Sequence, residues 1–220
     1  AAPTAFSLLR ADPNANPLTT PSGKIELYSA TIAGFDYDDC PGWARWMEPA
    51  EWLGSPLAEK YPLHLLSPQP DGKLHSQLDH GSESQRHKVH GRTVARMSVV
   101  EADRRGIENN NLVRIFNDRG ACLATARLDP SLRDGVITLP TGAWFDPVDP
   151  AMTGSLEKHG NPNVLTIDIG TSRLAQGPSA HTCLVDVEVF DSSPPPITAH
   201  NPPTFATLPW QAGRETEETE

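Results

Sequence analysis

Cysteines and long apolar runs are scarce in this chain, and each shortage excludes a class of protein. Only three cysteines occur in 220 residues, Cys40, Cys122 and Cys183, and no two are spaced as C-x-x-C. The sequence therefore encodes neither a disulfide framework nor a thiolate zinc site. Cys122 and Cys183 stand in apolar runs and are expected to be buried hydrophobic side chains. No apolar run approaches the roughly 18 residues of a membrane-spanning helix, so we expect no membrane insertion.

Basic residues are also in the minority. The chain has 18 Lys and Arg against 28 Asp and Glu, which gives a formal net charge of −10. This balance disfavours a nucleic-acid partner, because binding to a phosphate backbone requires positive charge. Part of the acidity lies in the last six positions, at Glu215, Glu217, Glu218 and Glu220.

Familiar catalytic signatures are missing as well. The sequence has no G-x-S-x-G, Walker A, G-x-G-x-x-G or H-E-x-x-H motif, and these mark the commonest hydrolases, nucleotide-binding proteins and metalloproteases. We therefore assign no catalytic residue and no metal ligand. His75, His80, His87 and His90 lack the thiolates and partner carboxylates of a zinc site and are interpreted as solvated loop histidines.

The chain is rich in turn-forming residues, with 22 prolines and 16 glycines, against an average usage of about 12% for the two together. Many turns and short strands follow. The clearest pattern is a β-hairpin, and many strands with few helices predict a mainly β fold, a small barrel. The predicted hairpin strands are 112–116 and 122–128; further strands are predicted at 25–28, 62–66, 135–139 and 182–190, a helix at 101–105 ending at Gly106, and a turn at 109–111.

The pattern of apolar residues changes near residue 60 and divides the chain. Residues 1–60 have little apolar periodicity, and their tryptophans (Trp43, Trp46 and Trp52) are expected to pack locally onto the following domain. Residues 61–190 are predicted to form the compact barrel. Residues 191–220 are predicted to be an extended acidic tail.

Polar and basic groups gather in loops of the predicted barrel. From Lys73 to Arg96 there are five basic residues and two acidic ones, and nearby loops offer hydroxyl, amide and imidazole groups. A small phosphorylated ligand fits this composition better than a polymer does. We expect the 73–77 loop to lie beside the 161–163 loop across one mouth of the barrel, because such a ligand must be held from both sides.

Five motifs in sequence order carry a resemblance to a known family. Together they resemble the C-terminal part of the dimethyl sulfoxide reductase family of molybdenum enzymes, particularly its biotin sulfoxide and trimethylamine N-oxide reductases, over about residues 12–190. The motifs are TPSGKIELYS at 20–29, PLHLLSPQP at 62–70 with LHSQL at 74–78, VRIFNDRG at 113–120, GAW at 142–144 and GNPNVLT at 160–166.

The resemblance implies a six-stranded double-psi β-barrel with short helices, preceded by an irregular segment that ends the upstream molybdopterin oxidoreductase body. It implies the cofactor-binding domain of an oxidoreductase that reduces S-oxides or N-oxides, such as biotin sulfoxide, methionine sulfoxide, dimethyl sulfoxide or trimethylamine N-oxide. The implied cofactor is molybdenum held by two molybdopterin guanine dinucleotides. Domains absent from this chain would bind it jointly and supply the serine ligand to the metal, so the fragment alone is expected to be inactive.

Other partners implied by the resemblance are the remainder of the parent enzyme and an electron donor of unknown identity. A cytoplasmic location is favoured, with the periplasm as the alternative. The alternative function is a stand-alone β-barrel binding or adaptor module without redox activity.

The resemblance also places cofactor contacts on particular residues. Lys73 stands where arginine is usual. Its ammonium group would act as a point charge, whereas the planar guanidinium of arginine can donate two parallel hydrogen bonds. The residues after Arg92 lack the family's usual acidic residue and proline, so no contact is assigned to Arg92. The implied contacts are Ser67, Pro68, Gln69, Pro70, Lys73, His75, Ser76, Gln77, Asn163, Ala180 and His181.

Overall fold

The computed structural model describes residue 4 and residues 6–202, and the acidic end of the predicted tail lies outside the described residues. The chain forms two compact units. The first unit comprises residues 1–50 and 167–179, and the barrel unit comprises residues 51–166 with those from Ala180 onward. Glu51 is the first residue of the barrel unit, where it is buried and binds Arg119 and the backbone N–H of Leu184.

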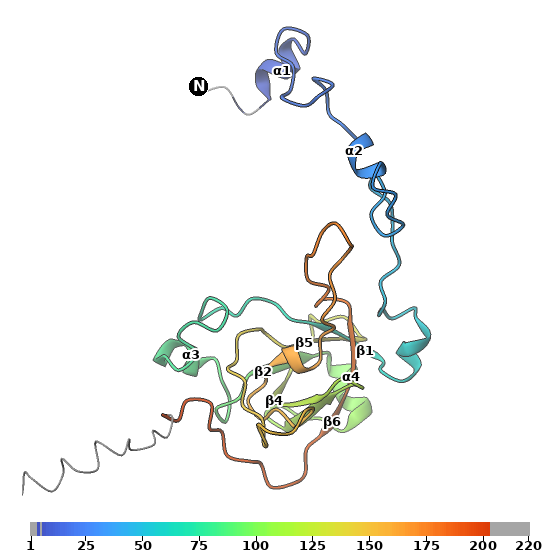
Figure 1. The fold of residues 1–220 in the computed structure, drawn as a ribbon. Coiled ribbons are helices and arrows are strands. Elements are labelled where there is room, and N and C mark those ends of the chain that lie inside the picture. The colour runs from blue at the N-terminus through green and yellow to red at the C-terminus, as the bar shows by residue number, and fades with distance from the viewer. Residues whose placement is uncertain (1–3, 5, 203–220) are drawn as a thin grey trace, which may run out of the picture. The chain divides into compact units, whose positions relative to one another are not determined.

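Six strands form a closed barrel in the order β1-β5-β2-β4-β3-β6, and Figure 1 shows these strands gathered in one body. The pairs β1/β5 and β2/β4 are parallel, and the four other neighbouring pairs are antiparallel. The predicted mainly β, six-stranded barrel is therefore confirmed. Its strands are β1 (Leu63–Leu66), β2 (Val94–Met97), β3 (Leu112–Phe116), β4 (Ala121–Leu128), β5 (Val136–Thr138) and β6 (Cys183–Val189).

The core fills the barrel interior with side chains that alternate along the strands. In β3, Val113 and Ile115 are fully buried while their neighbours are half-buried, as the period of two predicts. β4 is buried from Ala121 to Ala126. Burying each large aliphatic side chain contributes about 1.5–3 kcal/mol. Cys122 and Cys183 belong to this core, as expected, and are unpaired thiols.

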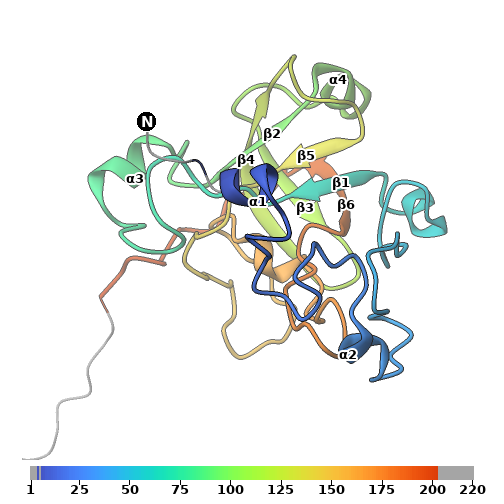
Figure 2. The ribbon, with the colours of Figure 1, turned by 90° about the horizontal axis from the view of Figure 1, so that it is seen from above.

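The predicted helix near residue 101 is α4 (Val99–Arg105). The Ser98 hydroxyl caps it by accepting the Glu101 N–H at 3.2 Å, and Gly106 ends it with a φ of 63°, a conformation that favours glycine. Figure 2 shows α4 at the opposite end of the barrel from η2. The remaining helices are α1 (Ser7–Ala11), α2 (Ala30–Ala33), α3 (Ser82–Arg86), and the 3₁₀ helices η1 (Pro56–Glu59) and η2 (Pro162–Val164).

The first unit corrects one prediction. The alternating segment 25–28 does not form a strand: Tyr28 makes one isolated bridge to Trp43, and Ile25 and Leu27 are exposed. Alternation alone does not make a strand, because backbone groups need a continuous partner. Trp43 stacks on Tyr28 with ring centroids 6.2 Å apart. No helix in the described part of the chain is long and apolar enough to cross a membrane.

Candidate functional site

Two chain segments implied by the resemblance meet at one mouth of the barrel. β1 leads into Ser67, and β6 begins just after His181. β1 and β6 are antiparallel with Leu65 opposite Cys183, so this register brings Ser67 and His181 to the same end. A ring nitrogen of His64 lies 2.6 Å from the His181 carbonyl oxygen and fixes the entry into β6.

The loops 73–77 and 161–163 contact a shared segment, residues 142–144. Lys73 Nζ donates to the Gly142 carbonyl at 2.8 Å, and Trp144 Nε1 donates to the Ser76 carbonyl at 2.8 Å. Asn161 Nδ2 donates to the Ala143 carbonyl at 2.9 Å. The two loops thus flank the same strip of backbone.

Gly142 makes this close approach feasible. Its φ is 89°, and a Cβ at this position would collide with the His75 carbonyl oxygen. The backbone of the 73–77 loop therefore lies directly on residue 142, and only glycine fits there.

Most of the implied contact residues have side chains that a ligand can reach. Gln69 donates to the Lys73 carbonyl at 3.3 Å, and the Pro68 carbonyl accepts the Thr141 N–H at 3.0 Å; both contacts hold the loop. The side chain of Lys73 is buried, as is Ser67; Pro70 and Ala180 are half-buried, and the exposed members are Pro68, Gln69, His75, Ser76, Gln77, Asn163 and His181.

Two buried hydroxyl groups in this region have no hydrogen-bond partner within the described chain. Ser67 is 5% exposed and Ser84 is 4% exposed, and the Oγ atoms of both are unsatisfied. A buried hydroxyl without a partner costs about 1–3 kcal/mol. Unsatisfied hydroxyls fit the binding of a polar cofactor by these loops.

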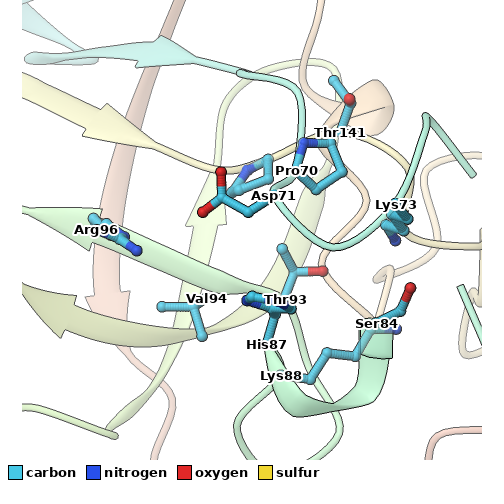
Figure 3. A pocket seen from close by; sticks show the side chains of 11 residues that line it. Pro70, Asp71, Lys73, Ser84, His87, Lys88, Thr93, Val94, Arg96 and Thr141 are labelled. Carbon is cyan, nitrogen blue, oxygen red and sulfur yellow. The ribbon is translucent and has the colours of Figure 1, made fainter. Parts of the chain in front are cut away.

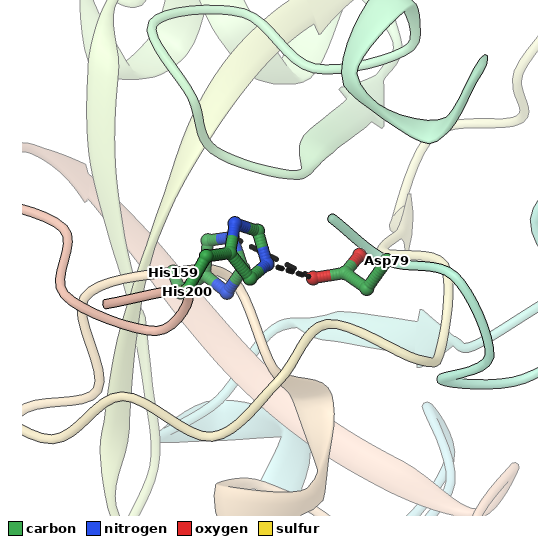
Figure 4. A group of neighbouring side chains, drawn as sticks. All are labelled: Asp79, His159 and His200. Carbon is green, nitrogen blue, oxygen red and sulfur yellow. Dashed lines mark hydrogen bonds and ion pairs between the residues drawn. The ribbon is translucent and has the colours of Figure 1, made fainter. Parts of the chain in front are cut away.

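An ionic network lies beneath the 73–77 loop and centres on Asp79. This fully buried carboxylate accepts hydrogen bonds from Lys73 Nζ, from Lys88 Nζ at 2.9 Å and from His200 Nε2 at 3.0 Å. Burial by itself would raise the pKa of Asp79, but the hydrogen bonds from Lys73, Lys88 and His200 hold it below its usual value. Figure 4 shows His159 and His200 facing the carboxylate. Sequence reasoning missed this network, although it counted Lys88 and Asp79 in the basic segment.

His159 extends the network toward Trp144. Its Nε2 lies 2.7 Å from Lys88 Nζ, and its Nδ1 lies 2.9 Å from the Trp144 carbonyl oxygen. Burial and the nearby charge of Lys88 lower the pKa of His159 to about 4. A neutral ring with its proton on Nδ1 donates to Trp144 and accepts from Lys88, which satisfies both nitrogens.

Glu157 fixes the turn that carries Asn161. Its carboxylate accepts the backbone N–H groups of Asp146, His159, Gly160 and Asn161 at 2.8–3.3 Å. Burial raises the pKa of Glu157 to about 7, although these backbone hydrogen bonds act in the opposite direction.

Residues 191–202, which we call the strap, have no helix or strand and lie on the barrel unit. The Thr198 N–H and hydroxyl donate to Asp146 at 2.7 and 2.6 Å, and His200 reaches Asp79. Arg92 donates to the carbonyls of Lys158 and Pro195 at 2.9 and 2.7 Å. Arg92 therefore holds the strap against the backbone of Lys158.

Polar loops and the unsatisfied hydroxyl of Ser67 thus lie at one mouth of a closed barrel. Residues 63–184 match the family model described as "Molydopterin dinucleotide binding domain". The chain belongs to this family of molybdopterin dinucleotide-binding domains. The molybdopterin part of the sequence-based prediction is therefore confirmed.

Curated relatives agree with this assignment. The chain is 50% identical over 185 residues to the biotin sulfoxide reductase of Cereibacter sphaeroides, which covers 84% of this chain and 24% of the relative. It is 48% identical over 191 residues to trimethylamine-N-oxide reductase 1 of Escherichia coli K12, and the aligned region covers 86% of this chain and 22% of the relative. The chain thus spans about a quarter of the length of these relatives.

A solved structure supports the fold independently. The acetylene hydratase from Pelobacter acetylenicus matches with a TM-score of 0.63 over 81% of this chain and 25% of that chain. The two sequences are 20% identical, so this likeness concerns the fold alone.

Proposed function

We propose that this chain is the cofactor-binding domain of a molybdenum oxidoreductase that reduces S-oxides or N-oxides. The observation that carries the proposal is the grouping of the implied contact residues at one barrel mouth, with Ser67 Oγ left unsatisfied. The matched relatives are named as sulfoxide and N-oxide reductases. The finer part of the proposal is that the cofactor is the guanine dinucleotide form, with two dinucleotides for each molybdenum.

The residues at this mouth would bind and orient the cofactor. Ser67, Ser76 and Gln77 offer hydroxyl and amide groups for hydrogen bonds, His75 and His181 offer imidazoles, and Asn163 offers a carboxamide. When bound, the group supplies the two-electron redox chemistry that removes the oxide oxygen. The protein's part is to hold it and to keep its polar groups satisfied.

The proposal extends to the parent protein. Because the chain spans about a quarter of its relatives, the rest of the polypeptide would supply the metal ligand and the other half of the cofactor site. Residues 1–60 would be the end of that larger body, residues 61–190 the cofactor-binding barrel, and the residues after 190 a tail.

The test uses the full-length protein that carries this chain. Purified protein is analysed for molybdenum and for the nucleotide released by acid hydrolysis, and reduction of biotin sulfoxide, dimethyl sulfoxide and trimethylamine N-oxide is measured with a reduced dye as donor. We expect molybdenum, two GMP for each metal, and reduction of at least one oxide. Protein without molybdenum and pterin contradicts the proposal and favours an adaptor module.

Two variants test the assigned residues. His75→Ala and Asn163→Ala should lower molybdenum content severalfold without lowering the melting temperature, because both side chains are exposed. Asn109→Ala is the matched control, since Asn109 is also exposed but binds the Leu128 N–H at the opposite end of the barrel. Full molybdenum occupancy and activity in both test variants would refute these two assignments.

A further inference from the structure

A small pocket lies beside the Asp79 network, and the resemblance indicates only Pro70 and Lys73 among the residues that line it. Figure 3 shows it between the loop that carries Asp71, helix α3 and the start of β2. Its volume is about 90 Å³, and its lining includes Lys73, Ser84, Lys88 and Thr93. One water molecule needs only about 10–15 Å³ of such space, so the pocket has room for a group of phosphate size.

The buried surroundings of the pocket carry excess positive charge. Lys73 and Lys88, whose side chains are 6% and 4% exposed, share the single carboxylate of Asp79. Each ammonium has three N–H groups. Lys73 uses two on Asp79 and Gly142, and Lys88 uses two on Asp79 and His159. One N–H of each lysine therefore remains for a ligand.

Neighbouring buried ions do not cancel this excess. Arg92 and Lys158 add two positive charges, and Asp146 and Glu157 add at most two negative ones. A buried unpaired charge is costly, so an anion in the pocket would stabilise the folded protein.

A metal ion does not explain the same groups. Ligand atoms of Asp79, His159 and His200 lie within 4.8 Å of one another. However, both Asp79 oxygens bind lysine ammonium groups, and Lys88 also holds His159 Nε2. The ammonium groups of Lys73 and Lys88 already occupy the positions that a metal ion would take, so an anionic ligand fits this region better.

Ser84 supplies an independent sign of a missing ligand. It is 4% exposed, lines the pocket, and its Oγ has no partner in the part of the chain that the structure describes. At the rim, Arg96 lies 3.7 Å from Asp129, and Figure 3 shows the Asp71 carboxylate on the same side, so the positive charge of the pocket comes from its interior lysines. The interior thus offers a hydroxyl and two ammonium donors.

We propose that this pocket binds one phosphate group of the dinucleotide's pyrophosphate, through Ser84, Lys88 and Lys73. The inference rests on the proposed function, because the phosphate belongs to the cofactor. It adds Ser84 and Lys88 to the binding residues and places them on α3 and the segment after it, outside the loops that the resemblance indicates.

The test titrates cofactor-free full-length protein, produced in cells that cannot make molybdopterin, with inorganic pyrophosphate and with inorganic phosphate by calorimetry. We expect pyrophosphate to bind to the cofactor-free protein and not to the loaded protein, since the cofactor then fills the pocket. Equal binding of pyrophosphate or phosphate to the loaded protein overturns the proposal in favour of a free-anion site. Absence of binding to the cofactor-free protein also overturns it.

Ser84→Ala separates binding from folding. Removing an unpartnered hydroxyl should leave the melting temperature unchanged or slightly higher, while pyrophosphate affinity falls about tenfold, the effect of one hydrogen bond to a charged ligand. Lys88→Met should abolish binding.

Ser131→Ala and Lys60→Met are the matched controls, because both residues lie in exposed surface contacts with Asp129 and Asp118. Wild-type affinity in Ser84→Ala overturns the proposal, and so does an equal loss in the controls. If wild-type protein carries molybdenum and the Ser84 variant binds normally, the pocket inference fails and the proposed function stands. If wild-type protein never carries molybdopterin, the proposed function fails.

Discussion

Each of the two units contains an Asp-centred ion pair of nearly the same length in a very different environment. In the first unit, Arg173 lies 2.7 Å from Asp38, with side chains 61% and 84% exposed. In the barrel unit, Lys88 lies 2.9 Å from Asp79, with side chains 4% and 0% exposed. Exposed pairs contribute about 0–1 kcal/mol because water competes for both ions. Because only the buried pair is shielded from water, we expect breaking it to cost more free energy of unfolding, although the two distances are similar.

Replacing the two aspartates tests this comparison most directly and should give the largest effect. Asp79→Asn leaves two buried ammonium groups without a carboxylate, and we expect a loss of about 3–5 kcal/mol in the free energy of unfolding. Asp38→Asn should cost less than about 1 kcal/mol. Urea denaturation of the 220-residue chain measures both. Similar losses in the two variants would show that the buried network is no stronger than the surface pair.

The second prediction concerns the effect of pH on the buried Asp79 network, through His159. The folded-state pKa of His159, about 4, lies below the ordinary value of 6.5. Stability from its neutral form is therefore present above pH 6.5 and is lost as the pH falls toward 4. The loss approaches about 3 kcal/mol at the lower limit.

Denaturation of wild type and His159→Gln between pH 7 and 4 measures this effect as a difference. Glu157, with its pKa raised to about 7, acts in the opposite direction: its contribution is lost as the pH rises through 7. Because both proteins contain Glu157, its contribution cancels in the difference. The half-exposed His87, replaced by Gln, is the control. A wild-type advantage that stays constant down to pH 4 would contradict the prediction.

The smallest expected effects compare two helix caps. The Ser98 hydroxyl accepts the Glu101 N–H at 3.2 Å and also donates to Asp134, while the Ser29 hydroxyl accepts the Ile32 N–H at 3.3 Å. Ser98→Ala should cost about 1–2 kcal/mol, because the residue is buried and makes both bonds. Ser29→Ala should cost about 0.5 kcal/mol. Thermal unfolding of each variant provides the measurement, and the reverse order of effects would count against burial as the deciding factor.

The parts of the fold that depend on short-range patterns can be predicted from the sequence. The hairpin of β3 and β4, helix α4 and its glycine end were predicted correctly, because alternation, capping and turn residues act within a few positions. β2 was missed, since Val94–Met97 is short and contains Arg96. The strand predicted at 25–28 was wrong, because a strand also requires a partner that the sequence pattern does not identify.

The ionic network could not be predicted in the same way. Asp79, Lys88, His159 and His200 come from four segments, and only the closed barrel and the strap bring them together. The surplus of basic residues between 73 and 96 signalled an anionic ligand, but not which lysines would be buried. The unsatisfied Oγ of Ser84 depends on its surroundings and has no signal in the sequence.

The closure of the barrel by β6 also determines the order in which the protein can fold on the ribosome. β6 pairs with β1 and β3, so a nascent chain without Cys183–Val189 has two unpaired strand edges and an open core. Asp146 and Asp79 gain their hydrogen bonds from Thr198 and His200 only after the strap has also been synthesised. Synthesis proceeds at about 5–20 residues per second, so these edges stay exposed for seconds after β5 is made. The barrel unit therefore completes its strand pairing and its buried ion pairs only after β6 and the strap have been synthesised.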